Sequence, residues 1–274
     1  MLHPRILRAL EDKLARPFTH IFNNSVATRI ILEDGKSENV TAIHRKRSRQ
    51  EPESYRHISL TSVVWKTMEL LVKGRLITHL EMNKKIGDSQ NGFRNKSSCL
   101  TSLLDFFSKV IGTYDIDNNK AVDFVYLNFQ KTFDRVPHEG LMVKINAPII
   151  QGDAARLIKN WLAVRRQWVC INQSSSNWAQ VTSGVPQGSV LGPLLFLWSR
   201  FDLDTNTISK IFKFSDDTKL SHRAINTDDI MELQEDINKL VELANKWQMN
   251  YNVDKCYVVH NGHNNIQGNH NIPN

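Results

Sequence analysis

Two adjacent carboxylates, Asp216 and Asp217, stand between two apolar stretches that predict a β-hairpin, residues 208–214 and 218–221. Like charges at a hairpin tip repel each other, and divalent cations would neutralise them. Mg²⁺ prefers a few carboxylates together with substrate phosphates, and two-metal sites hold such ions about 3.5–4 Å apart. The pair therefore suggests metal-assisted phosphoryl transfer, although a polar turn is the simpler interpretation of these residues alone.

A glycine- and proline-rich loop, Ser183–Pro193, is the second candidate. It runs into an apolar segment, residues 190–198, that predicts a helix. Glycine lets a ligand approach the backbone closely, and a helix N-terminus favours phosphate. An ordinary loop that caps a helix would also fit, but three glycines and two prolines within eleven residues form a specific string.

The elements that must position these residues change character along the chain. Apolar residues recur at helical spacing in the first part, where Pro17 predicts the end of the first helix. From residue 122 onward, strand-like runs alternate with helical ones, which indicates an α+β fold. Helices are predicted over residues 6–14, 21–32, 60–80, 100–111, 141–145, 154–162, 190–198 and 228–248. Strands are predicted over residues 40–43, 122–129, 168–171, 178–181, 208–214, 218–221 and 257–259.

The composition excludes several classes of protein. The 274 residues have a net charge of +7, with 41% hydrophobic and 23% charged residues, which is typical of a globular chain. Three widely spaced cysteines fit a reducing, intracellular compartment, either nucleus or cytoplasm. The longest apolar run, residues 190–198, is far shorter than the ~20 residues of a spanning helix, so no membrane partner is expected. A basic cluster at Arg45, Lys46, Arg47 and Arg49 either contacts a phosphate backbone or forms a solvated loop.

Six segments together resemble the reverse transcriptases of non-LTR (LINE-like, jockey-type) retrotransposons. The matched segments are YRHISL (55–60) and QNGFR (90–94) in the fingers, VYLNFQKTFD (125–134) for motif A, SGVPQGSVLGPLLF (183–196) for motif B, FSDDTKL (214–220) for motif C and NVDKC (252–256) for motif D. They occur in the order of the family and extend over nearly the whole chain.

This resemblance implies a right-hand polymerase fold, with helical fingers and a palm that carries an antiparallel sheet. Residues 1–120 would be mainly fingers, residues 121–262 mainly palm and residues 263–274 a flexible tail. In the family an endonuclease precedes this region and a thumb follows it, and we expect this sequence to lack both.

The resemblance also implies RNA-directed DNA synthesis, in which a primer 3′-hydroxyl attacks a dNTP with the help of two Mg²⁺ ions, or Mn²⁺. The partners would be an RNA template, a DNA primer and dNTPs. Asp216 and Asp217 would be catalytic metal ligands, and Lys255 would donate a proton to the leaving pyrophosphate. Contacts with nucleotide or template are implied for the steric gate Phe133 and for Gln187, Gly188, Arg56, Arg94 and Lys46.

The key departure from the family is Asn128, which stands where motif A has an aspartate that bridges both metals. Asparagine lacks that negative charge. Losing one transition-state donor costs about 2.7–4 kcal/mol, and losing a bridging ligand should cost at least as much. We therefore expect impaired activity. The alternatives are a catalytically dead remnant that still binds nucleic acid and a translated relic without function.

Two further features allow more than one interpretation. Arg200, in the apolar region after the loop, would be costly if it were buried without a partner. Cys256, His260, His263 and His270 have loosely zinc-like spacing, but irregular intervals in an Asn-rich segment argue against a structural zinc site.

Overall fold

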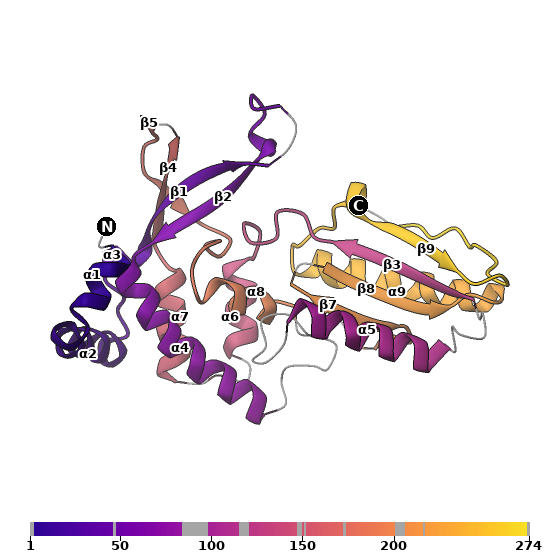
Figure 1. Ribbon diagram of the computed structural model, residues 1–274, viewed down its shortest axis with the longest axis horizontal. Coiled ribbons are helices and arrows are strands. Elements are labelled where there is room, and N and C mark those ends of the chain that lie inside the picture. The colour runs from indigo at the N-terminus through magenta and orange to yellow at the C-terminus, as the bar shows by residue number, and fades with distance from the viewer. Residues whose placement is uncertain are drawn as a thin grey trace. The chain divides into compact units, whose positions relative to one another are not determined.

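The chain folds into two compact units, Met1–Asn83 with Val136–Trp198, and Lys84–Arg135 with Ser199–Asn274. We call them the first and the second unit. The computed structural model describes residues 3–45, 48–83, 98–114, 121–146, 150, 152–171, 174–200, 206–215 and 217–272 (Figure 1). Each unit has a sheet of its own.

In the first unit, the strands of a small sheet project from a group of helices (Figure 1). Its helices are α1 (Pro4–Ala9), α2 (Glu11–Thr28), α3 (Glu33–Lys36), α4 (Val63–Met82), α6 (His138–Asn146), α7 (Asp153–Leu162) and α8 (Gly192–Trp198), with a 3-10 turn η1 (Pro52–Ser54). Its strands are β1 (Ser37–His44), β2 (Tyr55–Thr61), β4 (Arg165–Ile171), β5 (Ser174–Ser175) and β6 (Ala179–Val181). β1 lies between β2, which is antiparallel to it, and β4, which is parallel to it. β5 and β6 both pair with β4.

The core of the first unit forms between α4 and α7. Trp65, Met68 and Leu76 repeat at helical spacing along α4 and are buried. Ile158 and Trp161 of α7 are buried as well, and side chains of both helices line the same small cavity. The helix that follows β2 is thereby held firmly, which matters for the loop described below.

The second unit is a four-stranded antiparallel sheet with helices packed on it (Figure 1). The strand order is β7 (Lys210–Phe214), β8 (Asp217–Arg223), β3 (Val122–Asn128), β9 (Tyr257–Asn261). The helices are α5 (Cys99–Tyr114), α9 (Thr227–Lys246) and the 3-10 turn η3 (Val253–Lys255). The Phe106 ring of α5 packs on Phe124 and Phe212, with ring centroids 5.8 and 4.9 Å apart. Val125 and Leu220, whose side chains point to the other face, are fully buried.

Most of the predicted elements are present, including the hairpin around the two aspartates. Within the described part of the chain, none of the helices combines the length and the apolar character needed to cross a membrane. The prediction that Pro17 ends a helix is wrong. α2 begins at Glu11 and continues through Pro17 in its second turn, where the proline removes one backbone hydrogen bond. Phe18 and Phe22, stacked at 5.8 Å, keep the next turn in place.

The segment 263–274 also differs from the prediction of a flexible tail, because its described part, residues 263–272, packs on the second unit. The Asn265 amide donates to the buried carboxylate of Asp123, and the His270 ring contacts the other oxygen of that carboxylate. Asn271 exchanges two hydrogen bonds with Gln234 of α9. Hydrogen bonds to one buried carboxylate hold this segment in place. The composition of the segment, which is poor in apolar residues, gives no sign of such contacts.

Candidate functional site

The first part of the candidate site is the end of two paired strands in the second unit. β3 ends at Asn128 and β8 begins at Asp217, and the antiparallel register places these residues opposite each other. Asn128 Nδ2 donates a hydrogen bond to Asp217 Oδ1 at 2.9 Å. We call these residues the strand-end pair. The structure thus brings together the motif A and motif C positions, while Asp216 lies outside the described residues.

The predicted motif D packs against the same strand end. Asn252 N donates to the carbonyl of Asn128 at 2.7 Å. Asn128 N in turn contacts Cys256 Sγ at 3.5 Å, and burial raises the pKa of the Cys256 thiol. Lys255, the predicted proton donor, is exposed in η3. The structure therefore places the Asn252 main chain and the Cys256 thiol at the site, whereas the role of Lys255 stays a prediction.

A buried cation lies behind the turn that joins β7 and β8. Arg200 is 2% exposed, and its guanidinium donates to the Ser215 carbonyl and to the Thr218 hydroxyl. It also lies 4.4 Å from the centre of the Phe129 ring. Arg200 therefore connects residues on both sides of the turn. The cost expected for a buried arginine without partners is thereby reduced, because both terminal nitrogens of the guanidinium have hydrogen-bond acceptors.

The predicted steric gate follows the strand end directly. Phe133 is half-buried in the turn after β3, where Asp134 N donates to the Lys131 carbonyl at 2.9 Å. Thr132 is buried and donates its hydroxyl to the Phe129 carbonyl at 3.3 Å. The turn is thus well defined in the second unit, and its role in sugar selection stays a prediction.

The second group of predicted site residues lies in the glycine loop (residues 183–191), which belongs to the first unit and is described by itself. Ser59 N in β2 donates to the Gln187 carbonyl at 2.8 Å. Gly188 has φ of 137°, and a Cβ there would lie 2.3 Å from the Ser59 carbonyl oxygen. Only glycine therefore allows the loop to lie so close to β2. The segment of residues 55–60 and the glycine loop, which the sequence analysis treated separately, are therefore in direct contact.

The Gln187 side chain joins this assembly. With its amide oriented to satisfy its neighbours, Gln187 accepts from Arg56 Nε at 3.0 Å and donates to the His57 carbonyl at 2.9 Å. The structure therefore brings Arg56 and Gln187 together, and their roles toward a nucleotide stay predictions. Lys46 and Arg94, the other predicted contacts of triphosphate or template, lie outside the described residues.

Sequence analysis overlooked one buried acid beside the glycine loop. Glu69 of α4 is 3% exposed, and its carboxylate accepts hydrogen bonds from the main chain of Val190 and Leu191. A signal for it exists in the sequence. Glu69 follows the apolar residues Trp65 and Met68 at helical spacing, so it is an acid on the buried side of a helix.

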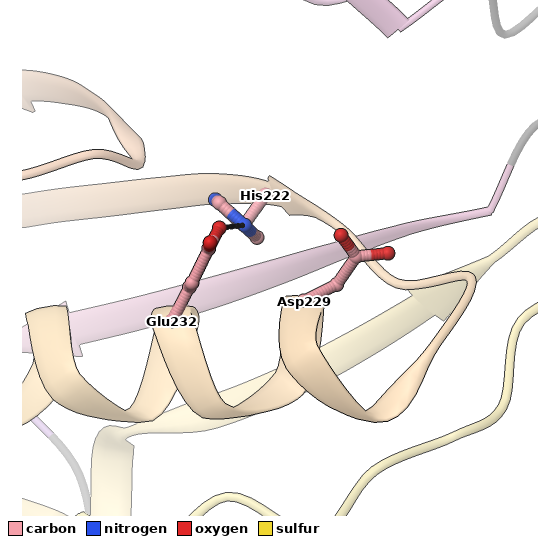
Figure 2. Close-up of side chains that lie close together, drawn as sticks. All are labelled: His222, Asp229 and Glu232. Carbon is pink, nitrogen blue, oxygen red and sulfur yellow. Dashed lines mark hydrogen bonds and ion pairs between the residues drawn. The ribbon is translucent and has the colours of Figure 1, made fainter.

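Among the described residues, one group of ligand atoms is close enough to suggest a metal site: His222, Asp229 and Glu232 (Figure 2). Asp229 is already occupied, because its two oxygens accept from the Arg223 guanidinium and from the main-chain N–H groups of Ile225 and Asn226. It belongs to the capping box of α9. Glu232 bonds His222 Nε2 at 3.1 Å. The group is explained as a helix cap beside a His–Glu pair.

The residues with zinc-like spacing are not assembled around a common point. His260 Nδ1 contacts Asp123 Oδ1 at 2.7 Å, and His270 Nε2 contacts Asp123 Oδ2 at 2.9 Å. Cys256 contacts Asn128 at the other end of β3. Two of the four residues thus serve a buried carboxylate.

The strand-end pair does not fit two Mg²⁺ ions. Mg²⁺ requires oxygen ligands, but Asn128 directs an amide N–H at Asp217 Oδ1. The two side chains supply one negative charge, where two carboxylates would supply two. A hydrogen bond closes the position between them that a shared cation would need.

An antiparallel sheet with motif positions at the ends of paired strands defines the palm of a right-hand polymerase, and solved structures agree with this fold. The chain is similar to apo telomerase from Candida tropicalis, with a TM-score of 0.59 and 10% identity over 92% of this chain and 50% of that one. A form of that telomerase truncated from its C-terminal domain gives 0.58 and 14% identity over 84% and 51%. The predicted α+β, right-hand fold is confirmed.

The chain belongs to the reverse transcriptase (RNA-dependent DNA polymerase) family, whose model matches residues 43–270. It is 29% identical over 91% of its length to a probable RNA-directed DNA polymerase from transposon X-element of Drosophila melanogaster. It is 27% identical over 93% to the RNA-directed DNA polymerase from mobile element jockey of the same species. The chain spans less than a third of the length of these relatives, 28% and 29%. The predicted resemblance is confirmed.

Proposed function

We propose that this chain is the polymerase domain of a jockey-like mobile element, built to extend a DNA primer on an RNA template, and that its catalysis is impaired at Asn128. Its membership of the family and its relatives' activities support the first part. The observation that carries the second part is the 2.9 Å hydrogen bond from Asn128 Nδ2 to Asp217 Oδ1.

The physical reason is the balance of charge at the strand ends. Two Mg²⁺ or Mn²⁺ ions would supply the electrostatic stabilisation of phosphoryl transfer when bound. Asn128 removes one of the negative charges that hold them and uses an amide proton to occupy an Asp217 oxygen. Removing a single transition-state donor lowers kcat by about 10²–10³, so a loss of at least this size follows from the substitution.

The remaining roles follow the family at matched positions. Gln187, Gly188 and Arg56 would orient the nucleotide, and Phe133 would exclude a ribose 2′-hydroxyl. Arg94 and Lys46 would contact triphosphate or template, Asp216 and Asp217 would hold the metal, and Lys255 would protonate the leaving pyrophosphate. The main-chain bond between Ser59 and Gln187 supports the first of these roles, because it holds the loop in one defined shape.

Primer extension on an RNA template with dNTPs and Mg²⁺ or Mn²⁺ tests the proposal. The chain is expected to extend primers at background level, and Asn128→Asp at a rate at least about 100-fold higher. Asn250→Asp adds the same charge at an exposed neighbour and should leave the rate at background. Efficient extension by the unchanged chain would show that Asn128 is a competent ligand and would overturn the impairment.

A catalytically dead nucleic-acid binder is the second candidate, favoured by the net charge of +7 together with the altered strand end. It predicts that the chain binds an RNA–DNA duplex with an affinity that falls steeply with salt. It also predicts that Asn128→Asp restores no incorporation. A relic without function would give neither binding nor a cooperative melt.

A further inference from the structure

A buried carboxylate supports the glycine loop at a second point, separate from the contact of the loop with β2. Glu69 is 3% exposed in α4, and its Oε2 accepts from Val190 N at 2.6 Å and from Leu191 N at 3.0 Å. These N–H groups lie just before α8, where no residue of that helix can accept them. The carboxylate therefore satisfies two main-chain donors that would otherwise be unpaired.

Burying this acid is unfavourable unless its charge is compensated. Its surroundings are mostly apolar, and the cavity it lines is formed by Ile31, Trp65, Met68, Val72, Leu157, Ile158, Trp161 and Leu191. Burial raises the pKa of Glu69, and the two N–H donors and the charge of Arg165 oppose that rise only in part. Arg165 is fully buried, with Glu38 3.8 Å away. Because burying this carboxylate costs free energy, we expect its oxygens to have a specific structural role.

The glycine loop is held on two sides. On one side, Gly188 lies against the Ser59 carbonyl and Gln187 bonds β2. On the other side, Glu69 holds Val190 and Leu191. Only two residues separate Gln187 from Val190, so a shift at Val190 is transmitted along the backbone to Gln187.

We propose that Glu69 is a positioning residue for nucleotide binding: it sets the path of the glycine loop through Val190 and Leu191 and thereby orients Gln187. The inference rests on the proposed function, since only a loop that meets a nucleotide needs this orientation. The residue itself touches only protein groups.

Hydrogen exchange of the main-chain amides in the whole chain tests this role without requiring polymerase activity. Glu69→Leu removes both acceptors and is expected to speed exchange of Val190 and Leu191 by about tenfold or more. Glu69→Gln keeps a carbonyl oxygen and should restore most of the protection. Glu81→Gln, an exposed position on the same helix, should change nothing.

A fluorescent dNTP provides the second measurement. Glu69→Leu should weaken its binding about tenfold, Glu69→Gln much less and Glu81→Gln not at all. If no variant, including the unchanged chain, binds the dNTP, the proposed function fails while the exchange data still decide the loop contact.

Two results would overturn the proposal. One is unchanged exchange at Val190 and Leu191 in Glu69→Leu. The other is faster exchange throughout α4 and α7, which would make Glu69 a general stabiliser of the core. If Glu69→Leu fails to fold, Glu69→Gln decides alone, because loss of its charge should then speed exchange at these two amides more than at Ile158, whose amide lies in α7.

Discussion

The glycine loop and the strand-end pair are two parts of one predicted site, and they differ in what determines them. Main-chain groups hold the loop: Ser59 N bonds the Gln187 carbonyl, and Val190 N bonds the Glu69 carboxylate. At the strand ends, the backbone register of Asn128 and Asp217 is regular, and the chemistry depends on the side chains alone.

This difference separates two requirements that a family resemblance combines. The shape of the loop depends on backbone conformation and on the absence of a side chain at Gly188. The metal chemistry depends on charge, and the change from aspartate to Asn128 exchanges one oxygen for an NH₂ group of nearly the same size. A sheet can therefore pair correctly to its last residue while the charge of the side chains at that end differs.

Asn128→Asp should have the largest effect on activity. It would give the strand-end pair the motif A residue of the family, as the glycine loop already has its motif residues. Beyond the gain in primer extension, it should make the melting temperature depend on divalent cations. Without them, two carboxylates replace a hydrogen bond and the chain should lose about 1–2 kcal/mol. With Mg²⁺ the loss should be reversed.

Thermal melting with and without Mg²⁺ checks this expectation. The unchanged chain should show no comparable response to Mg²⁺, and neither should Asn250→Asp. A response of the unchanged chain as large as that of Asn128→Asp would mean that the strand-end pair already holds the ion.

Gly188→Ala tests the backbone side of the comparison. A methyl group would meet the Ser59 carbonyl at 2.3 Å, and φ of 137° is strained for alanine. The chain should lose at least about 2 kcal/mol and the ability to bind a dNTP. Gly74→Ala is the matched control, because open space surrounds Gly74 in α4 and alanine should stabilise the helix by about 0.5–1 kcal/mol. Urea unfolding and dNTP titration of both variants measure these changes, and equal behaviour of the two would contradict this account of the loop.

The contrast also explains which features the sequence predicts well. Periodic apolar patterns place α4, α5, α9 and the β7–β8 hairpin, because each element buries one face in its own unit. The family resemblance assigned Asn128 and Asp217 to one metal site, but the register that pairs them was visible only in the structure. The boundaries of the two units depend on long-range contacts, so the sequence did not predict them.

Two features that escaped prediction are buried polar groups with distant partners. Glu69 meets Val190 across 121 residues, and Asp123 meets His270 across 147. Neither pairing leaves a periodic signal in the sequence. Pro17 escaped for a different reason, because α2 continues through a proline in its interior.

Arg200→Met tests whether the ends of β3 and β8 also depend on the buried guanidinium of Arg200. The methionine fills similar space but loses the bonds to the Ser215 carbonyl and the Thr218 hydroxyl. A loss of about 2 kcal/mol is expected, since hydrogen bonds from a charged donor are involved. Exchange at the Thr218 and Lys219 amides should rise more than exchange in α9. Arg200→Lys keeps the charge without the planar fork and should fall between the two. A uniform rise in exchange across the second unit would show that Arg200 acts only through general packing.

Asp123→Asn replaces an aspartate by asparagine at the other end of β3, the opposite of the Asn128→Asp substitution. It should have the smallest effect of the four. Burial raises the pKa of Asp123, but hydrogen bonds from His270, Asn265 and His260 outweigh burial and hold it below its usual value. A lowered folded-state pKa means that the contribution to stability is complete above the unfolded-state pKa, about 3.9. It is lost as the pH falls through the lower, folded-state value. The variant should therefore lose about 1–2 kcal/mol at pH 7, and this difference should shrink below about pH 4.

Urea unfolding from pH 7 to pH 3 measures this difference, with the exposed Asp254→Asn as control. A difference that stays constant with pH would mean that His270 and His260 are held by shape rather than by charge, and the two ends of β3 would then differ less than the structure indicates.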